Sequence, residues 1–146
     1  MTAYLSITSP MCLMSGSAPA FGNEEPRVLA PQTCGGLRRR VGGPAVMVDQ
    51  LDKILKLERE GKATPQVIPF EVGAHAAQDG NFVLLEFQES SPVVFVEGLT
   101  TNLYLERDSD LYRYREAMDY LRDAARIPRD SVALIAEVQK SYAEGK

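Results

Sequence analysis

Residues 67–106 decide the fold of this chain, and they read VIPFEVGAHAAQDGNFVLLEFQESSPVVFVEGLTTNLYLE. Three runs have the β-branched and aromatic composition of strands: residues 66–70, 82–87 and 93–97. The second and third runs are separated by Gln88–Pro92, a length typical of an antiparallel hairpin. Pro69 cannot donate a ladder hydrogen bond, so the first run is predicted at a sheet edge or with its N–H side free. Residues 103–105 are a candidate for a short fourth strand.

Apolar residues three or four positions apart predict an amphipathic helix on each side of these strands. The upstream helix is predicted to begin at Pro44, where the missing N–H costs nothing, and to end at Gly61. Its apolar stripe consists of Met47, Val48, Leu51, Ile54 and Leu55. Two downstream helices, separated by Pro128, carry the stripes Leu111, Tyr114, Met118, Leu121, Ala125 and Val132, Leu134, Ile135, Val138, Tyr142. This order predicts an α+β fold, a small antiparallel or mixed sheet of three to four strands packed by an N-terminal helix and two C-terminal helices.

The composition is that of one globular domain. Of 146 residues, 45% are hydrophobic and 25% are charged, which suffices for a core. The formal net charge is -4, and residues 44–146 carry twelve basic against eighteen acidic side chains, so this part is expected to repel a phosphate backbone. No apolar run approaches the ~18 residues of a membrane span, and the two cysteines form no CxxC motif. We therefore expect a cytoplasmic protein with no membrane contact, no disulfide framework and no metal site.

The first quarter of the chain shows no helical or alternating apolar pattern. Residues 1–36 are rich in Ser, Thr, Ala, Pro and Gly, so they are predicted to form a disordered arm, or a segment joined from another reading frame. The domain is then predicted to span residues 37–146. Near its start stand Arg38, Arg39 and Arg40, which are either a weak nucleic-acid contact or, as we prefer, a solvated run of charge.

Several local strings occur in a recognisable order: VGGP at 41–44, VIPF at 67–70, LEF at 85–87, YLE at 104–106 and DS at 130–131. In this order, over about residues 37–142, the chain resembles the C-terminal domain of unknown function of actinobacterial XRE-family helix-turn-helix regulators. The resemblance implies an antitoxin-like transcription regulator whose C-terminal domain senses a molecule or pairs with a protein. It carries over no catalytic or ligand-binding residue.

The function that the resemblance implies is a regulatory domain that binds a partner or an effector. A helix-turn-helix domain needs about five short helices, and residues 1–36 show no such periodicity. We therefore expect contact with DNA only indirectly, through a helix-turn-helix that this chain lacks. The expected partner is a small partner protein, of the kind encoded beside such regulators, or a second copy of the chain. Two alternatives remain open: a small-molecule-binding domain with weak or no catalysis, and a nonfunctional truncated fragment.

Glu86 and Glu97 are the sharpest chemical candidates in the sequence. If the hairpin is centred on residues 90–91, its register puts both carboxylates on one face of the sheet, as diagonal neighbours ~7–8 Å apart. Paired carboxylates at such a separation can act as general acid and general base. Glutamates at strand ends more often bond a loop or pair with an arginine, and we prefer that interpretation. The available arginines are Arg107, Arg113 and Arg115.

His75 is the single histidine, and it lies in the Gly/Ala-rich loop of residues 71–81, which is long enough to shape a pocket rim. Because no Cys or second His is near it, we do not expect it to bind a metal. No nucleophile elbow and no phosphate-binding glycine loop accompanies it. His75 and Tyr104, with Glu86 and Glu97, are candidates for contacts to a ligand or partner. No enzyme activity and no cofactor is predicted.

Overall fold

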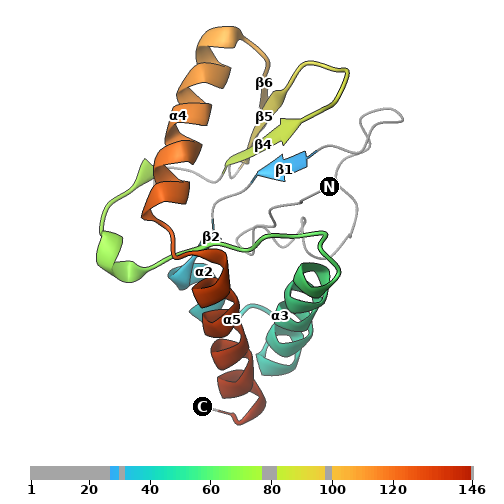
Figure 1. Cartoon of the computed structure of the whole chain (residues 1–146), viewed down its shortest axis with the longest axis vertical. Coiled ribbons are helices and arrows are strands. Elements are labelled where there is room, and N and C mark those ends of the chain that lie inside the picture. Colours follow the sequence, from blue (N-terminus) through green and yellow to red (C-terminus); the bar gives the residue numbers. More distant parts are fainter. Residues whose placement is uncertain (1–26, 30–31, 77–81, 98–99, 146) are drawn as a thin grey trace.

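The computed structural model describes residues 27–29, 32–76, 82–97 and 100–145. Two packed parts make up this portion of the chain (Figure 1). One is an antiparallel sheet with a long helix along it, and the other is a group of three helices that includes the C-terminal one. The α+β fold class predicted from the sequence is confirmed.

Within the described ranges, the main sheet has four strands in the order β1-β4-β5-β6, and each neighbouring pair is antiparallel. Its strands are β1 (Arg27–Leu29), β4 (Phe82–Glu86), β5 (Val93–Glu97) and β6 (Asn102–Leu105). The two runs predicted as a hairpin, β4 and β5, form the central pair. The fourth strand expected near residues 103–105 is β6, which lies at one edge of the sheet.

Helix α4 (Asp108–Ala124) lies along one face of this sheet (Figure 1). Its predicted apolar stripe is packed against the strands, where the ladders bring Leu29, Leu84 and Val94 into line. We call this cluster the sheet–α4 core. Its buried members are Leu29, Ile68, Phe82, Leu84, Val94, Leu111, Met118 and Leu121.

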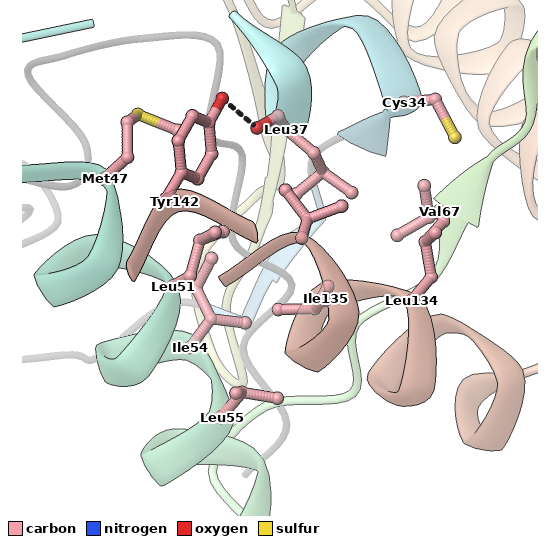
Figure 2. Packing of buried hydrophobic residues seen from close by; sticks show 11 residues of the cluster. Cys34, Leu37, Met47, Leu51, Ile54, Leu55, Val67, Leu134, Ile135 and Tyr142 are labelled. Atoms are coloured by element: carbon pink, nitrogen blue, oxygen red, sulfur yellow. Dashed lines mark hydrogen bonds between the residues drawn. The ribbon is translucent and has the colours of Figure 1, made fainter. Parts of the chain in front are cut away.

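Helices α2 (Cys34–Arg38), α3 (Pro44–Arg59) and α5 (Pro128–Ala143) form the second part. Figure 2 shows the apolar side chains of α3 and α5 meeting between the two helices, as their stripes predicted. The hydroxyl of Tyr142 donates a hydrogen bond of 3.0 Å to the carbonyl oxygen of Leu37, which ties α5 to α2. We call this cluster the three-helix core. Its buried members are Cys34, Leu37, Met47, Leu51, Ile54, Leu55, Val67, Leu134, Ile135, Val138 and Tyr142.

A second, two-stranded sheet lies between the two cores. In it, β2 (Gln32–Thr33) pairs in parallel with β3 (Val67–Ile68). Successive side chains of a strand point to opposite faces. Accordingly Val67 is buried in the three-helix core, and Ile68 is buried in the sheet–α4 core. The short 3₁₀ helix η1 (Phe70–Val72) follows.

A buried serine joins β3 to the connection between α4 and α5. The side-chain oxygen of Ser131, which is fully buried, accepts a hydrogen bond of 3.0 Å from the backbone N–H of Val67. The same hydroxyl donates to the carbonyl oxygen of Arg126 at 3.1 Å. The backbone N–H of Arg126 in turn donates to the carbonyl oxygen of Val67 at 2.9 Å. The backbone polar groups of Val67 are therefore satisfied without water, as burial requires.

The prediction of a disordered arm over residues 1–36 is wrong for its final part. Residues 27–29 form β1, and Leu29 is buried in the sheet–α4 core. Cys34 begins α2 and is buried in the three-helix core. These elements are two to five residues long, too short to show a hydrophobic period, and they are stabilised by contacts with distant parts of the chain. Residues 1–26 and 30–31 lie outside the described residues.

The first strand run does not belong to the main sheet, although the predicted sheet of three to four strands included it. Its position at a sheet edge is confirmed, because both strands of a two-stranded sheet are edge strands. That run is β3, which covers only residues 67–68 and pairs with β2 in the separate sheet. Pro69 ends the strand, as its missing donor would suggest, and η1 follows it directly. The correct partner could not be found because β2 lies within the segment that the composition assigned to disorder.

Candidate functional site

An open pocket of about 510 Å³ lies between the sheet and the N-terminal half of α4. Its walls come from β4, β5, β6, α4 and the loop that follows η1. The lining residues are Ala76, Phe82, Val96, Leu105, Arg107, Asp110, Arg113, Tyr114 and Ala117. Proteins bind small molecules in pockets of about 300–1,000 Å³, lined mostly by apolar side chains with a few polar groups. The volume and the lining of this pocket both fit that description.

The floor of the pocket is apolar because the strand register lines up side chains from three strands. Phe82 of β4 is the ladder partner of Val96 of β5, and Leu105 of β6 has the same phase. The ring of Tyr114 packs edge-on against that of Phe82, with centroids 4.9 Å apart and planes at 62°. Ala117 faces the same space from α4 with only a methyl group, so the helix leaves the volume unfilled.

The rim of the pocket is charged. The Nε atom of Arg107 lies 2.9 Å from Oδ2 of Asp110, and this ion pair spans the first turn of α4. Arg113 is exposed, and it forms no ion pair with any other described residue. Among the described lining residues, two arginines and one aspartate give a formal charge of +1, although the whole chain carries -4. The first turn of α4 adds the positive end of its helix dipole to this region.

Glu86 lies outside this pocket and has a structural role. Its carboxylate oxygens are 3.5 Å from an Nη of Arg27 on β1 and 3.6 Å from an Nη of Arg115 on α4. The side chain is 30% exposed, so these ion pairs are partly screened by solvent. The interpretation that a strand-end glutamate pairs with arginines is confirmed, because Glu86 connects the edge strand β1 to the helix above it.

The predicted pairing of Glu86 with Glu97 is wrong. In the observed ladder Phe82 pairs with Val96 and Leu85 pairs with Val93, so the register differs by three residues from the one assumed. A shift by an odd number of residues moves every position of a strand to the opposite phase. Positions 94 and 96 of β5 are on the same face of the sheet as position 86, so position 97 is on the opposite face. Position 97 is also the ladder partner of Asn102, at the end of the hairpin far from the turn.

The other predicted candidates are not brought together. Tyr104 is 53% exposed and stacks at 5.1 Å on Phe95, in the strand phase opposite to that of the pocket floor. The Nδ1 atom of His75 is buried and has no hydrogen-bond partner among the described residues, and His75 adjoins the lining residue Ala76 without lining the pocket itself. Arg38, Arg39 and Arg40 are exposed at the end of α2, away from all of these. Their contact with nucleic acid stays a prediction.

The pocket residues on α4 were missed as site residues. The sequence does contain a pattern that could have indicated them: Arg107, Asp110, Arg113 and Ala117 lie three to four positions apart, beside the apolar stripe that includes Tyr114. The sequence could not show that the small side chain of Ala117 faces a part of the sheet where no larger side chain fills the space. A pocket depends on the side chains of both the helix and the sheet, and the helix pattern describes only the helix.

Cys34 is the one cysteine within the described residues, and its thiol is free and buried. It begins α2, where the side chain of Thr33 accepts a hydrogen bond of 3.2 Å from the N–H of Gly36. Burial raises the pKa of the Cys34 thiol above its usual value, although the positive charges of Arg126 and Arg38 act in the opposite direction. A neutral, buried thiol is a packing group rather than a nucleophile.

The comparisons with known proteins agree with a single domain that includes this pocket. Residues 18–137 match the model of a family described as a domain of unknown function, DUF5753. The chain belongs to this family. The match begins at residue 18, so the family's domain includes part of the segment that we predicted outside it. No curated protein and no solved structure matches the chain.

Two further observations bear on the kind of site. Within the described ranges, no three or more His, Cys, Asp or Glu side chains are grouped so that they could hold a metal ion. Each described helix is too short or too polar to traverse a bilayer. The pocket between the sheet and α4 is the candidate site for binding a ligand.

Proposed function

We propose that this chain is the regulatory domain of an XRE-type helix-turn-helix transcription regulator, and that a small effector molecule binds in the pocket between the sheet and α4. The regulator context rests on the resemblance described above for strings such as VIPF at 67–70 and YLE at 104–106. The single observation that carries the effector-binding function is the pocket itself. Convergent apolar and charged side chains around a space of this size are the common form of a small-molecule site.

The position of the pocket suits a regulatory role. One of its walls is α4, which is also packed in the sheet–α4 core through Leu111, Met118 and Leu121. The chain then passes through Arg126, which is hydrogen-bonded to β3, into α5. A ligand that moves the first turns of α4 would act on a helix that is connected to both cores. The proposal involves no catalytic step and no cofactor.

Direct recognition of DNA is not part of the proposal. Residues 44–146 have a net charge of -6, which opposes association with a phosphate backbone. The exposed residues Arg38, Arg39 and Arg40 would support, at most, a weak contact without sequence preference that disappears as salt is added. In the proposed regulator, the helix-turn-helix contacts DNA and this domain supplies the response to the effector.

The test is a thermal-shift screen of cytoplasmic metabolites against the whole chain. We expect at least one compound to raise the melting temperature in proportion to the logarithm of its concentration, because a ligand that binds only the folded state stabilises it. The variant Ala117→Leu, which places a larger side chain in the pocket, should lose this response. Ala136→Leu, at an exposed position of α5, is the matched control and should keep it.

Two results would contradict the effector-binding function. One is the absence of any stabilising compound in a library that spans acids, bases and neutral molecules. The other is a stabilising compound whose effect is the same in Ala117→Leu and in the unchanged chain, because such a compound binds elsewhere.

A second candidate function, the capture of a partner protein, is favoured by a different observation. β6 is the edge strand of the main sheet, and two of its side chains, Leu103 and Tyr104, are each more than half exposed. An edge strand with exposed apolar side chains can pair with a strand of another chain. The partner would be a small partner protein or a second copy. Light scattering over a range of concentrations tests self-association, and Leu103→Lys should abolish it if β6 is the interface.

A further inference from the structure

We infer that the pocket between the sheet and α4 takes a small amphipathic monocarboxylate, a molecule with an aromatic or branched apolar body and one carboxylate group. This inference rests on the proposed function, because it names the class of effector that the same pocket would bind. It is carried by three properties of the described lining: the apolar floor, the charge of the rim, and the arrangement of the two arginines within that rim.

The floor of the pocket selects an apolar body. Its side chains from the strands are Phe82, Val96 and Leu105, and α4 adds the ring of Tyr114 and the methyl group of Ala117. None of these side chains presents a charge to the interior. The edge-to-face pair of Phe82 and Tyr114 forms an aromatic corner, against which a further ring or a branched alkyl group can pack. A ligand composed only of polar groups would place those groups against apolar side chains with which they cannot form hydrogen bonds.

The rim selects a negative charge at one end of that body. Arg113 is exposed at the pocket and forms no ion pair with any other described residue, so its guanidinium group can bind an added anion without first losing an ion pair. The planar fork of a guanidinium matches the two oxygens of a carboxylate.

The second arginine explains why one negative charge fits better than two. Arg107 is already paired with Asp110 at 2.9 Å, and the carboxylate of Asp110 also lines the pocket. The lining therefore offers a formal charge of +1, which a carboxylate neutralises. A phosphate dianion would bring two negative charges close to Asp110, and one of them would remain without a counter-charge. The arrangement favours a carboxylate over a phosphate ester of the same body.

The experiment compares head groups on a constant body. The probes are 4-phenylbutanoate, 4-phenylbutanamide, 4-phenylbutylamine and 4-phenylbutyl phosphate, with the same four head groups on a branched alkyl body. Each is titrated into the ¹⁵N-labelled whole chain, and the dissociation constant is read from the amide resonances of α4. The titrations are repeated for Arg113→Gln and for the control Arg59→Gln, which alters an exposed arginine of α3 outside the pocket.

We expect at least one carboxylate to bind about tenfold more tightly than its amide, the increment typical of a charge-assisted pair at a partly exposed site. Arg113→Gln should remove this tenfold difference and leave the binding of the amide unchanged, whereas Arg59→Gln should change neither. Because both positions are exposed, neither substitution threatens the fold, and the melting temperature of each variant verifies this.

The outcomes separate the ligand class from the proposed function. If amide and carboxylate bind equally, or if the amine or the phosphate ester binds more tightly, the monocarboxylate class is wrong while the pocket remains an effector site. If no carboxylate shifts the α4 resonances but the metabolite screen gives a compound sensitive to Ala117→Leu, the class is again wrong and the function stands. If neither experiment gives a ligand, both proposals fall.

Discussion

The three-helix core and the sheet–α4 core use similar aliphatic side chains but differ in how completely they are filled. In the first, α3 and α5 face each other with long side chains on both surfaces, and residues such as Leu51 and Ile135 are at most 1% exposed. In the second, the half of α4 around Met118 and Leu121 is packed equally well. Between Leu111, which is also buried, and Met118, the helix presents Ala117 and the edge-on ring of Tyr114 to the strands, and a pocket remains.

This difference teaches that stability and binding are divided between neighbouring positions of one helix. Leu111, Met118 and Leu121 of α4 contribute to the core and would respond to mutation as a core does. Tyr114 and Ala117 instead border an accessible apolar surface with charged groups at its rim. Substitutions that enlarge or reduce a side chain should therefore have opposite consequences in the two regions.

The largest effect is expected from truncating the same residue type in both regions. Leu51→Ala removes a fully buried side chain between α3 and α5, and it should lower the free energy of unfolding by about 2–5 kcal/mol. Leu105→Ala removes a partly buried side chain at the pocket floor, where solvent already has access, and it should cost about 1 kcal/mol. Urea denaturation measures both. Equal losses would contradict the distinction between a filled and a hollow region.

A somewhat smaller effect is expected at the junction of the two cores. Ser131→Ala leaves the buried N–H of Val67 without an acceptor, and it should lower the free energy of unfolding by about 1–3 kcal/mol. The control is Ser141→Ala in the same helix, where the hydroxyl donates only to the carbonyl oxygen of Val138 within α5. That change should stay within about 0.5 kcal/mol. A Ser131→Ala variant as stable as its control would show that the junction does not hold the two cores together.

Enlarging alanines gives the third comparison. Ala63→Leu adds volume at a position that is 5% exposed and should cost about 1–3 kcal/mol, because a packed site cannot accept it without displacement. Ala117→Leu directs the same added volume into the pocket, so its effect on the free energy of unfolding should be close to zero or stabilising. Thermal and urea denaturation of the two variants test this. A large destabilisation by Ala117→Leu would mean that the pocket is already filled.

The smallest effect concerns the pH dependence of the three-helix core. Burial raises the pKa of Cys34 in the folded chain, so folding favours the neutral thiol. The contribution of the buried neutral thiol to the free energy of unfolding is fully present below the unfolded-state pKa. This contribution should be lost as pH rises from about 9 through the higher folded-state pKa. The test compares Cys34 with Cys34→Ala, both in a Cys12→Ser background. Between pH 7 and pH 10.5, the urea midpoint of the chain with Cys34 should fall relative to that of Cys34→Ala. A constant difference would contradict a raised pKa.

The helices of both cores could be predicted from the sequence because their contacts repeat at a fixed period. Every member of the α3 stripe from Met47 to Leu55 is buried or partly buried, and the stripes of α4 and α5 are confirmed in the same way. The β4–β5 hairpin was also predictable, since its two strands are close in sequence. In these elements, the residues that the local sequence pattern marks as apolar are the residues that make the tertiary contacts.

The rest depended on contacts between distant residues. β1 is three residues long, and it is a strand because Arg27 and its neighbours pair with Glu86 and the residues before it, nearly sixty positions away. The predicted hairpin register was wrong by three residues because the turn contains two serines and a proline, with no Asn-Gly or Asp-Gly pair to fix it. That single error created the apparent pairing of Glu86 with Glu97.

The candidate site was the least predictable part. Of the residues proposed from the sequence, Glu86 proved to be an ion-pair partner of two arginines, and Tyr104 lies in the strand phase opposite to the pocket floor. The pocket depends instead on the small size of Ala117 opposite Phe82 and Val96. Missing volume has no counterpart in a sequence motif, because it depends on two surfaces meeting in the folded chain.

Val67 and Ile68 are consecutive residues, yet each is buried in a different core. One core cannot unfold alone without withdrawing part of β3 and so exposing side chains that belong to the other. The two parts are therefore expected to melt as one cooperative unit, with amides in α4 and α5 exchanging with solvent hydrogen at the same global opening free energy. A molecule bound at one end of the domain would then slow hydrogen exchange as far away as the C-terminal helix.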